Sequence, residues 1–200
     1  MTSANVQNIL SVYNLANAGD LTTGLSWYHQ ALAVAKTIAT RYGIHPHEAA
    51  GVIAALSPRN RWERNLQDAE NLIAAYAAAG AEGCAKIKVC TFSANKAKAI
   101  RILEAGCITD ADVIKILSGP KLTEFYSCIV GISDVCIDGH AYAIWFGERV
   151  TLENVPSIGV KLRREIKADY RKAAEILGVS PAQCQAVTWC AWRRLFGVSK

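Results

Sequence analysis

The sequence has little of what marks several large classes of protein. It has five prolines and no low-complexity run, which excludes collagen-like and linker-dominated architectures. No apolar stretch approaches the roughly 20 residues needed to cross a bilayer. Residues 1–10 lack the basic and apolar segments of a secretory signal. We therefore expect a cytoplasmic protein that has no membrane partner.

The seven cysteines include no Cys-x-x-Cys pair, so the sequence lacks the signature of a zinc ribbon. Their odd number also argues against a secreted disulfide scaffold. We interpret them as small buried hydrophobic side chains. His45 and His47 lie too close together to be metal ligands one helical turn apart. We expect no metal and no cofactor.

Apolar residues, by contrast, are abundant enough to fill a core. Hydrophobic residues make up 52% of the 200 residues and charged residues 20%, which is typical of a folded chain of one domain or two small lobes. There are 22 Lys and Arg against 17 Asp and Glu, a formal net charge of +5. This excess permits a polyanionic partner such as DNA without requiring one.

Helix start and stop signals recur along the chain and agree with one another. The predicted helices run from Thr22 or Thr23 to Tyr42, from Pro46 to Leu56, from Asn60 to Ala79, from Asn95 to Ala105, from Thr109 to Leu117, from Lys121 to Gly131, from His140 to Phe146, from Val160 to Leu177, and from Ser180 to before Gly197. Residues 132–137 are β-prone, but one isolated strand cannot form a sheet. The pattern predicts an all-α protein.

A basic turn follows the apolar helix that ends near Leu56. Arg59, Asn60 and Arg61 lie at the N-terminus of the helix predicted from Asn60, where arginine side chains and unpaired backbone N–H groups both favour phosphate. Trp62 is suited to stacking on a base. Taken alone, the turn favours the alternative, a solvated connection with Trp62 in the core.

Two further segments have features of phosphate-binding sites. Lys96 and two other basic residues lie at the start of the helix around 93–101, as a phosphate site or as an exposed charged face. Leu117-Ser118-Gly119-Pro120-Lys121 joins two helices in a helix-hairpin-helix pattern. Its turn offers backbone N–H groups to a phosphate near Gly119.

Asp138 is the acidic residue whose surroundings best fit catalysis. It follows the apolar run 135–137, opens a helix and precedes Gly139-His140. As a helix cap alone it contributes about 1 kcal/mol. The helix N-terminus also favours its negative charge, and an ionised carboxylate in a cleft can stabilise a developing sugar cation.

In their order, these segments resemble the helix-hairpin-helix DNA glycosylase superfamily, which includes endonuclease III. Residues 53–57 resemble the apolar helix before the family's L-S-x-Q turn, and 95–100 resemble its N-x-K-A-x-x-I helix. Residues 117–121 resemble its L-P-G-V-G-x-K hairpin, and 137–140 its V-D-T-H. The resemblance covers residues 45–147 closely. The hairpin is shorter than the family's and lacks its second glycine, and the endonuclease III four-cysteine cluster is absent.

The resemblance implies two helical lobes. The central lobe covers about 45–130 with the hairpin, and the second lobe about 1–44 plus 131–200. By position, Asp138 matches the catalytic aspartate and Lys121 the lysine that attacks the sugar in members with lyase activity. Arg59 matches the residue that fills the gap left by the flipped base, and Gly119 the phosphate-gripping turn.

The resemblance predicts a DNA glycosylase that flips a base and cleaves its N-glycosidic bond, with or without lyase activity. One alternative is a phage-type base-hypermodification transferase on the same fold, and another is a non-catalytic helical DNA-binding protein, because fold does not settle chemistry. The expected DNA contacts are Arg59, Asn60, Arg61, Lys96 and Gly119. The expected base pocket includes Trp27, Tyr28, Trp62 and His140, although most such residues pack in cores.

Overall fold

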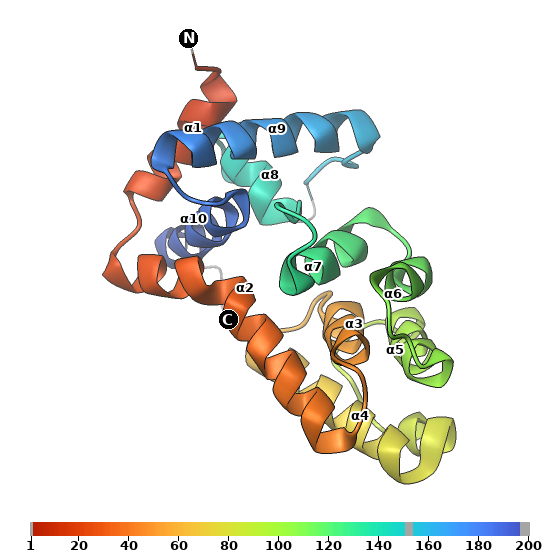
Figure 1. The fold of residues 1–200 in the computed structure, drawn as a ribbon. Coiled ribbons are helices and arrows are strands. Elements are labelled where there is room, and N and C mark those ends of the chain that lie inside the picture. The colour runs from red at the N-terminus through yellow and green to blue at the C-terminus, as the bar shows by residue number, and fades with distance from the viewer. Residues whose placement is uncertain (1, 151–153, 197–200) are drawn as a thin grey trace. The chain divides into compact units, whose positions relative to one another are not determined.

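The protein is all-α, as the sequence predicts. A computed structural model describes residues 2–150 and 154–196, which form ten helices and no strand and can be followed by colour in Figure 1. The helices are α1 (Ala4–Asn14), α2 (Ala18–Tyr42), α3 (Pro46–Leu56), α4 (Trp62–Ala85), α5 (Ser93–Ala105), α6 (Asp110–Leu117), α7 (Pro120–Val130), α8 (Gly139–Phe146), α9 (Val160–Leu177) and α10 (Pro181–Leu195). None of these described helices is long and apolar enough to span a membrane.

Local caps begin and end many helices where the sequence predicts them. The side-chain oxygens of Thr109, Asp138 and Ser180 each accept a hydrogen bond from the backbone N–H three residues later. Glycines with a left-handed backbone follow five helices: Gly43, Gly106, Gly131, Gly147 and Gly178. These signals are local in sequence, which explains why they are readable without the fold.

The start of α2 differs from the prediction. The helix begins at Ala18 because Asn17 and Asp20 cap it reciprocally. Asn17 Oδ1 accepts from the Asp20 N–H at 2.9 Å, and Asp20 Oδ2 accepts from the Asn17 N–H at 3.0 Å. Thr22 lies inside the helix, where its hydroxyl donates to the Ala18 carbonyl. The expected start at Thr22 or Thr23 is therefore wrong.

Two other helices also differ from the prediction. α4 begins at Trp62 with Arg61 as N-cap, so the predicted helix start at Asn60 is wrong. It runs to Ala85 with non-helical backbone at residues 79 and 80, where the prediction placed its end. α1 was not predicted, and the Ser3 hydroxyl caps it by accepting from the Val6 N–H.

The chain divides into two compact units. Unit 2 is the continuous segment from His29 to Gly131. Unit 1 combines the described residues up to Tyr28 with those from Ile132 onward. The helix α2 begins in unit 1 and ends in unit 2.

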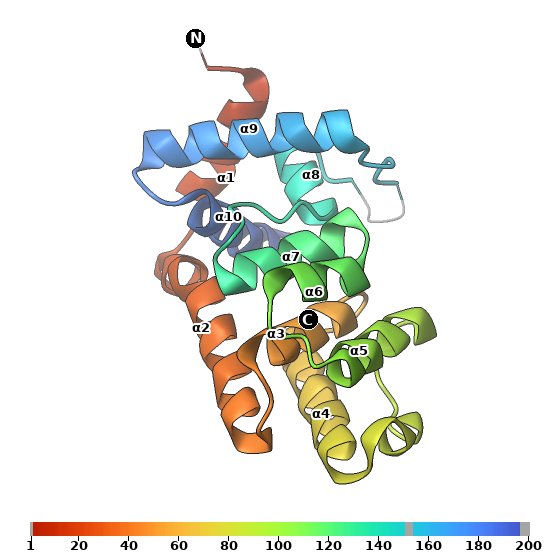
Figure 2. The same ribbon diagram turned by 45° about the vertical axis from the view of Figure 1, so that its right-hand side comes forward.

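Unit 2 is built around α3, whose residues 49–56 are all buried. The helices α4, α5, α6 and α7 pack against it, as Figure 2 shows. Its small side chains allow close approach: a Cβ at Gly51 would lie 2.7 Å from Val113 Cγ1 and 3.1 Å from Ile102 Cδ1. This buried axis sets the positions of the helices that carry the unit's loops.

A polar contact ties α3 to the hairpin helices α6 and α7. Tyr126 is fully buried, and its hydroxyl donates to Asp110 Oδ1 at 2.7 Å while lying 2.7 Å from His47 Nδ1. Burial, and then the hydrogen bond and charge of Asp110, raise the pKa of Tyr126. The hydroxyl therefore stays protonated at neutral pH and links three helices around the hairpin.

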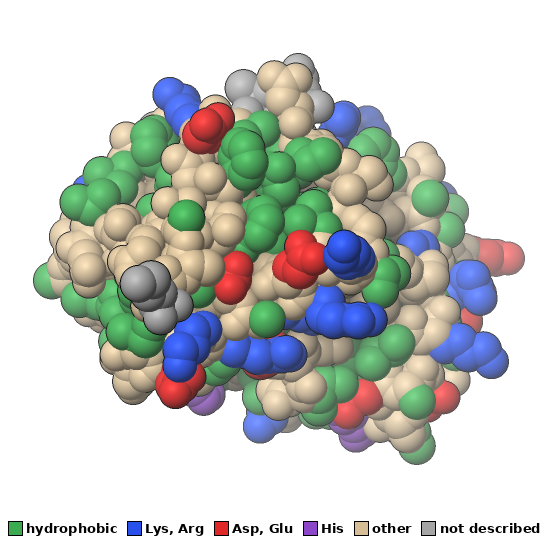
Figure 3. Space-filling view, turned by 90° about the horizontal axis from the view of Figure 1, so that it is seen from above, with side chains coloured by type: hydrophobic (Ala, Val, Ile, Leu, Met, Phe, Trp, Pro, Cys, Tyr) green, Lys and Arg blue, Asp and Glu red, His purple; other side chains and the backbone are tan. Residues whose placement is uncertain are grey.

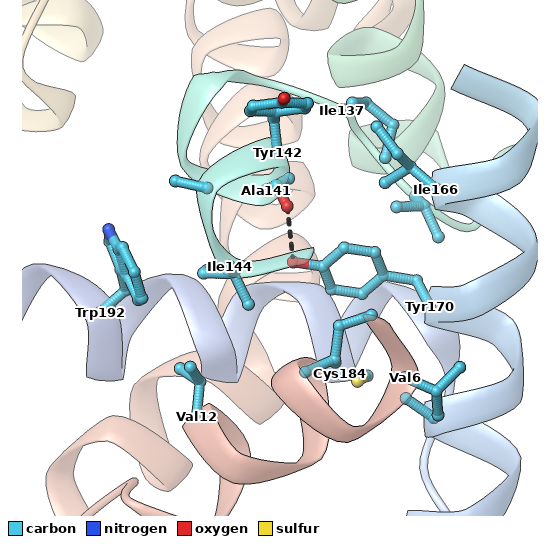
Figure 4. Close-up of a cluster of buried hydrophobic side chains, with 14 of the residues drawn as sticks. Val6, Val12, Ile137, Ala141, Tyr142, Ile144, Ile166, Tyr170, Cys184 and Trp192 are labelled. Atoms are coloured by element: carbon cyan, nitrogen blue, oxygen red, sulfur yellow. Dashed lines mark hydrogen bonds between the residues drawn. The ribbon is translucent and has the colours of Figure 1, made fainter. Parts of the chain in front are cut away.

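In unit 1, the helices α1, α8, α9 and α10 supply one cluster of buried apolar side chains, shown in Figure 4. At its centre the fully buried Tyr170 donates a hydrogen bond to the Ala141 carbonyl at 3.4 Å. The first half of α2 packs closely against α10. A Cβ at Gly24 would lie only 2.5 Å from Val187 Cα. The backbones of these two helices are therefore in direct contact.

Most cysteines fit their interpretation as small hydrophobic side chains. Five are buried: Cys84, Cys107, Cys128, Cys136 and Cys184. Burial raises the pKa of the Cys84 and Cys107 thiols, and that of Cys184 to about 12. These three thiols therefore stay protonated at neutral pH, a form that is a poor nucleophile.

Candidate functional site

The basic turn of unit 2 is held by a buried carboxylate that sequence reasoning missed. Asp68 on α4 is 1% exposed and accepts hydrogen bonds from Arg64 Nε at 2.7 Å, Asn60 Nδ2 at 3.1 Å and the Cys90 backbone N–H at 2.7 Å. Charge-assisted hydrogen bonds of this kind are among the stronger polar contacts in proteins. They join the turn, the start of α4 and the segment before α5.

The turn presents arginine side chains on its outer side. Arg59 and Arg61 are exposed, and the Arg59 guanidinium lies 5.0 Å from the centre of the Phe92 ring. Arg59 has a φ of 57°, a left-handed conformation that costs a non-glycine residue about 1 kcal/mol. The Thr91 hydroxyl donates to the Pro58 carbonyl at 2.9 Å and braces the turn. Two positive groups are thereby held beside the N-terminus of α4.

Asn60 and Trp62, predicted in the same turn, have internal contacts. Asn60 Nδ2 also donates to the Leu56 carbonyl at 3.4 Å, so its amide nitrogen holds the turn. The Trp62 ring is half-buried and packs edge-on against Phe125, with ring centres 6.5 Å apart. Both side chains therefore take part in the structure of the turn, whatever else they contact.

The turn between α6 and α7, here called the hairpin, is short. It runs through Ser118, with a φ of 40°, and Gly119, with a φ of 87°, into α7, whose N-cap Gly119 makes no side-chain hydrogen bond. Lys98 of α5 reaches the end of α6, where its ammonium donates to the Leu117 and Ser118 carbonyls. Ser118, Gly119, Pro120 and Lys121 are all exposed. The turn and Lys121 are therefore accessible to a ligand.

Lys96 lies in neither the hairpin nor the basic turn around Arg59 and Arg61, which is called the arginine turn below. Its ammonium donates to the Ala85 carbonyl at 3.1 Å and to the Ile87 carbonyl at 2.6 Å, beyond the end of α4. A lysine there satisfies carbonyls that lack helical partners. This geometry gives Lys96 a structural role.

Asp138 lies in unit 1 at the start of α8. Its Oδ1 accepts from the Ala141 N–H at 2.8 Å, and the side chain is half-buried, as is that of His140. Burial is the main cause of the raised pKa of Tyr170, and the nearby charge of Asp138 contributes to it. The carboxylate is thus oriented by the helix and remains partly accessible.

Trp27 and Tyr28 of α2 contact α10. The Trp27 and Trp189 ring centres are 5.0 Å apart, and the Arg193 guanidinium lies 4.4 Å from the Trp189 ring centre. The Tyr28 hydroxyl donates to Gln185 Oε1 at 2.8 Å. Sequence reasoning did not select Trp189 or Arg193, although their spacing of four residues places them on one helical face.

The predicted residues fall into two groups. Unit 1 holds Trp27, Tyr28, Asp138 and His140, whereas unit 2 holds Arg59, Asn60, Arg61, Trp62, Lys96, Gly119 and Lys121. In unit 2, the four consecutive residues Arg59, Asn60, Arg61 and Trp62 lie together at the turn before α4. Lys121 and Gly119 adjoin each other in the hairpin.

Comparison with known proteins gives a family without an assigned activity. The profile described as "Family of unknown function (DUF7178)" matches residues 1–195, so the chain belongs to this family. No curated protein and no solved structure matches the chain.

Proposed function

We propose that the protein is a DNA glycosylase-like enzyme that binds DNA through unit 2 and cleaves the N-glycosidic bond of a flipped base. The observation that carries the proposal is the turn anchored by Asp68, which holds the exposed Arg59 and Arg61 beside a helix N-terminus. Fixed arginines beside a helix N-terminus are suited to phosphate. The exposed hairpin at Gly119 in the same unit offers a second such contact.

In this proposal Asp138 supplies the chemistry. Base departure leaves a sugar with oxocarbenium character, and an ionised carboxylate favours that charge. The cap on α8 uses Oδ1 and orients the group. Lys121 is proposed as a nucleophile that attacks the sugar and forms a Schiff base, and water replaces it if the enzyme has no lyase activity.

The hairpin favours a second candidate, a transferase that modifies a DNA base without releasing it. Pro120 is the first residue of α7 and has no N–H to donate to a phosphate. The contact of this hairpin with the DNA phosphate backbone therefore differs from that expected for a glycosylase hairpin. A different reaction on the same fold is compatible with this difference.

Mass spectrometry of small molecules released from genomic and modified phage DNA tests the proposal. A glycosylase releases a free base, a transferase changes the base in place, and a non-catalytic binding protein does neither. Asp138→Asn keeps a good helix cap, so we expect normal folding and a loss of turnover on the order of a hundredfold. Asp134→Asn, the same change four residues earlier, should keep full turnover. Normal turnover of Asp138→Asn would reject the assignment of Asp138.

Borohydride trapping tests Lys121 separately. A Schiff base would give a covalent protein–DNA adduct in the wild type but not in Lys121→Gln. Lys115→Gln, which removes an exposed lysine from α6, is the matched control. Base release without an adduct would reject only the lyase role.

A further inference from the structure

The helix α9 has two contrasting sides. Ile166, Tyr170 and Ala173 on one side are fully buried in the core of unit 1. At 3.6 residues per turn, the exposed side carries Glu165 and Glu175 together with five basic residues, here called the basic face of α9: Lys161, Arg164, Lys167, Arg171 and Lys172. Figure 3, seen from above relative to Figure 1, shows Lys and Arg side chains gathered in a band on the side where α9 lies.

The two ends of this face differ in how their charges are balanced. Near the C-terminal end, Arg171 pairs with Asp134, and Lys172 pairs with Glu175 at 2.8 Å. Near the N-terminal end, Lys161 and Arg164 are exposed, and neither makes an ion pair with any described residue. The first half of the face therefore carries two exposed basic side chains without an ion pair to a described residue, beside one exposed acidic residue, Glu165.

This placement does not serve the stability of the helix. The N-terminus of a helix favours acidic side chains and disfavours basic ones. The first turn of α9 has no acidic residue, and its Gly159 N-cap has no side chain to accept a hydrogen bond. Residues that break a local stability rule without a compensating contact are expected at functional surfaces.

We propose that the basic face of α9 binds the phosphate backbone of duplex DNA, as a second contact surface that belongs to unit 1. The inference rests on the proposed function, because the partner is the same DNA. From Lys161 to Lys172 the helix rises about 16 Å, long enough to follow several successive phosphates. Arginine and lysine contacts to phosphate position a protein without reading sequence.

The structure favours DNA over a membrane surface as the partner. A helix that lies in a membrane inserts its apolar side among the lipids. The apolar side of α9 is already buried in the core of unit 1. Apart from Val160 and Ile176, the exposed surface of the helix is mostly charged, and its basic residues outnumber the exposed acidic residues Glu165 and Glu175, which suits a polyanion.

Duplex DNA binding by fluorescence anisotropy at several salt concentrations tests the proposal. The double variant Lys161→Gln/Arg164→Gln should bind more weakly, with a salt-dependence slope smaller by about two units. The control Lys36→Gln/Lys86→Gln removes two exposed lysines of unit 2 and should leave the slope within about half a unit of wild type. Because Lys161 and Arg164 make no ion pair with a described residue, the α9 variant should melt at the wild-type temperature or slightly above it.

Each other outcome has a distinct meaning. If the wild type and the α9 variant bind DNA equally, the inference is wrong and the proposed function stands. Equal losses in the α9 variant and the control would also overturn the inference, because they show an effect of net charge alone. Binding to anionic vesicles that needs Lys161 and Arg164, with DNA binding unchanged, would reassign the face to lipid. A wild type that does not bind DNA would overturn both proposals.

Discussion

The two units differ in what they bury. Of the buried carboxylates among the described residues, Glu48, Asp68 and Glu124 belong to unit 2, whereas Asp20 belongs to unit 1. Unit 1 instead gathers a large apolar cluster from four helices. In unit 2, Glu48 caps α3 and Asp68 fixes the arginine turn, so its buried charges hold loops and helix starts.

This difference shows where a rigid ligand contact is to be expected. Apolar packing holds helices together but leaves the loops between them adjustable. A buried carboxylate with several donors fixes a loop in one conformation, because breaking the set leaves polar groups unpaired. The arginine turn of unit 2 is fixed in this way.

The largest effect is expected for Asp68→Ala. Asn60 Nδ2 and the Cys90 N–H would lose their acceptor in a buried place, which should lower the free energy of unfolding by about 3 kcal/mol. Urea unfolding measures this, and the variant should also bind DNA more weakly because the turn is no longer fixed. Glu82→Ala, an exposed change on α4, should do neither. A loss below about 0.5 kcal/mol would mean that Asp68 does not organise the turn.

Smaller losses of stability are expected when the buried tyrosines of the two units, Tyr126 and Tyr170, are each replaced by phenylalanine. Tyr126→Phe removes a hydroxyl with close partners in His47 and Asp110, so we expect a loss of about 1–2 kcal/mol. Tyr170→Phe removes a longer hydrogen bond, 3.4 Å, and should cost about 0.5–1 kcal/mol. Equal losses of unfolding free energy would show that the hydrogen bonds of Tyr126 stabilise the protein no more than the hydrogen bond of Tyr170 does.

The same tyrosines predict how stability depends on pH. The pKa of Tyr126 is raised above its ordinary value of 10.0, so the folded state keeps the neutral form. Its contribution is complete below pH 10 and is lost as the pH rises further, because the unfolded chain ionises first. Between about pH 8 and about pH 11, Tyr126→Phe should therefore lose less stability than the wild type does.

The smallest effect is expected for Asp134→Asn. Burial raises the pKa of the Asp134 carboxyl, but the hydrogen bond and charge of Arg171, with Lys167 nearby, outweigh it and lower the pKa below 3.8. The pair contributes above that pH and is lost as the pH falls through the lowered value. Because the pair is partly exposed, the variant should lose less than about 1 kcal/mol at neutral pH, and it should lose less than the wild type on acidification. A larger loss at neutral pH would mean that unit 1 also relies on charge pairs.

The sequence predicts the parts of the fold that local chemistry decides. The caps at Thr109, Asp138 and Ser180, and the glycine stops, need only a few neighbouring residues. The Asn17–Asp20 cap is equally local, but the threonines that follow offer a competing start.

The candidate site is less predictable because its anchors are distant in sequence. The exposure of Arg59 and Arg61 follows from their charge, but Asp68 reads as an ordinary surface residue of an amphipathic helix. Its partner at Cys90 is 22 residues away. The structural use of Lys96 is likewise set by carbonyls on another segment. Only the packing of the helices reveals either role.

The contact between Gly24 and Val187 also has a consequence for synthesis on the ribosome. The segment of unit 2 is continuous and emerges before any of α8, α9 or α10. The first half of α2 cannot make this contact until α10 has been synthesised. At ordinary translation speeds this takes on the order of ten seconds. For most of that time, until α8 and α9 have been made, the face of α1 that carries Val6, Ile9 and Val12 has no partner helix to cover it. The nascent chain therefore exposes an apolar surface of α1 throughout the synthesis of unit 2, and a ribosome-associated chaperone would be needed at this surface.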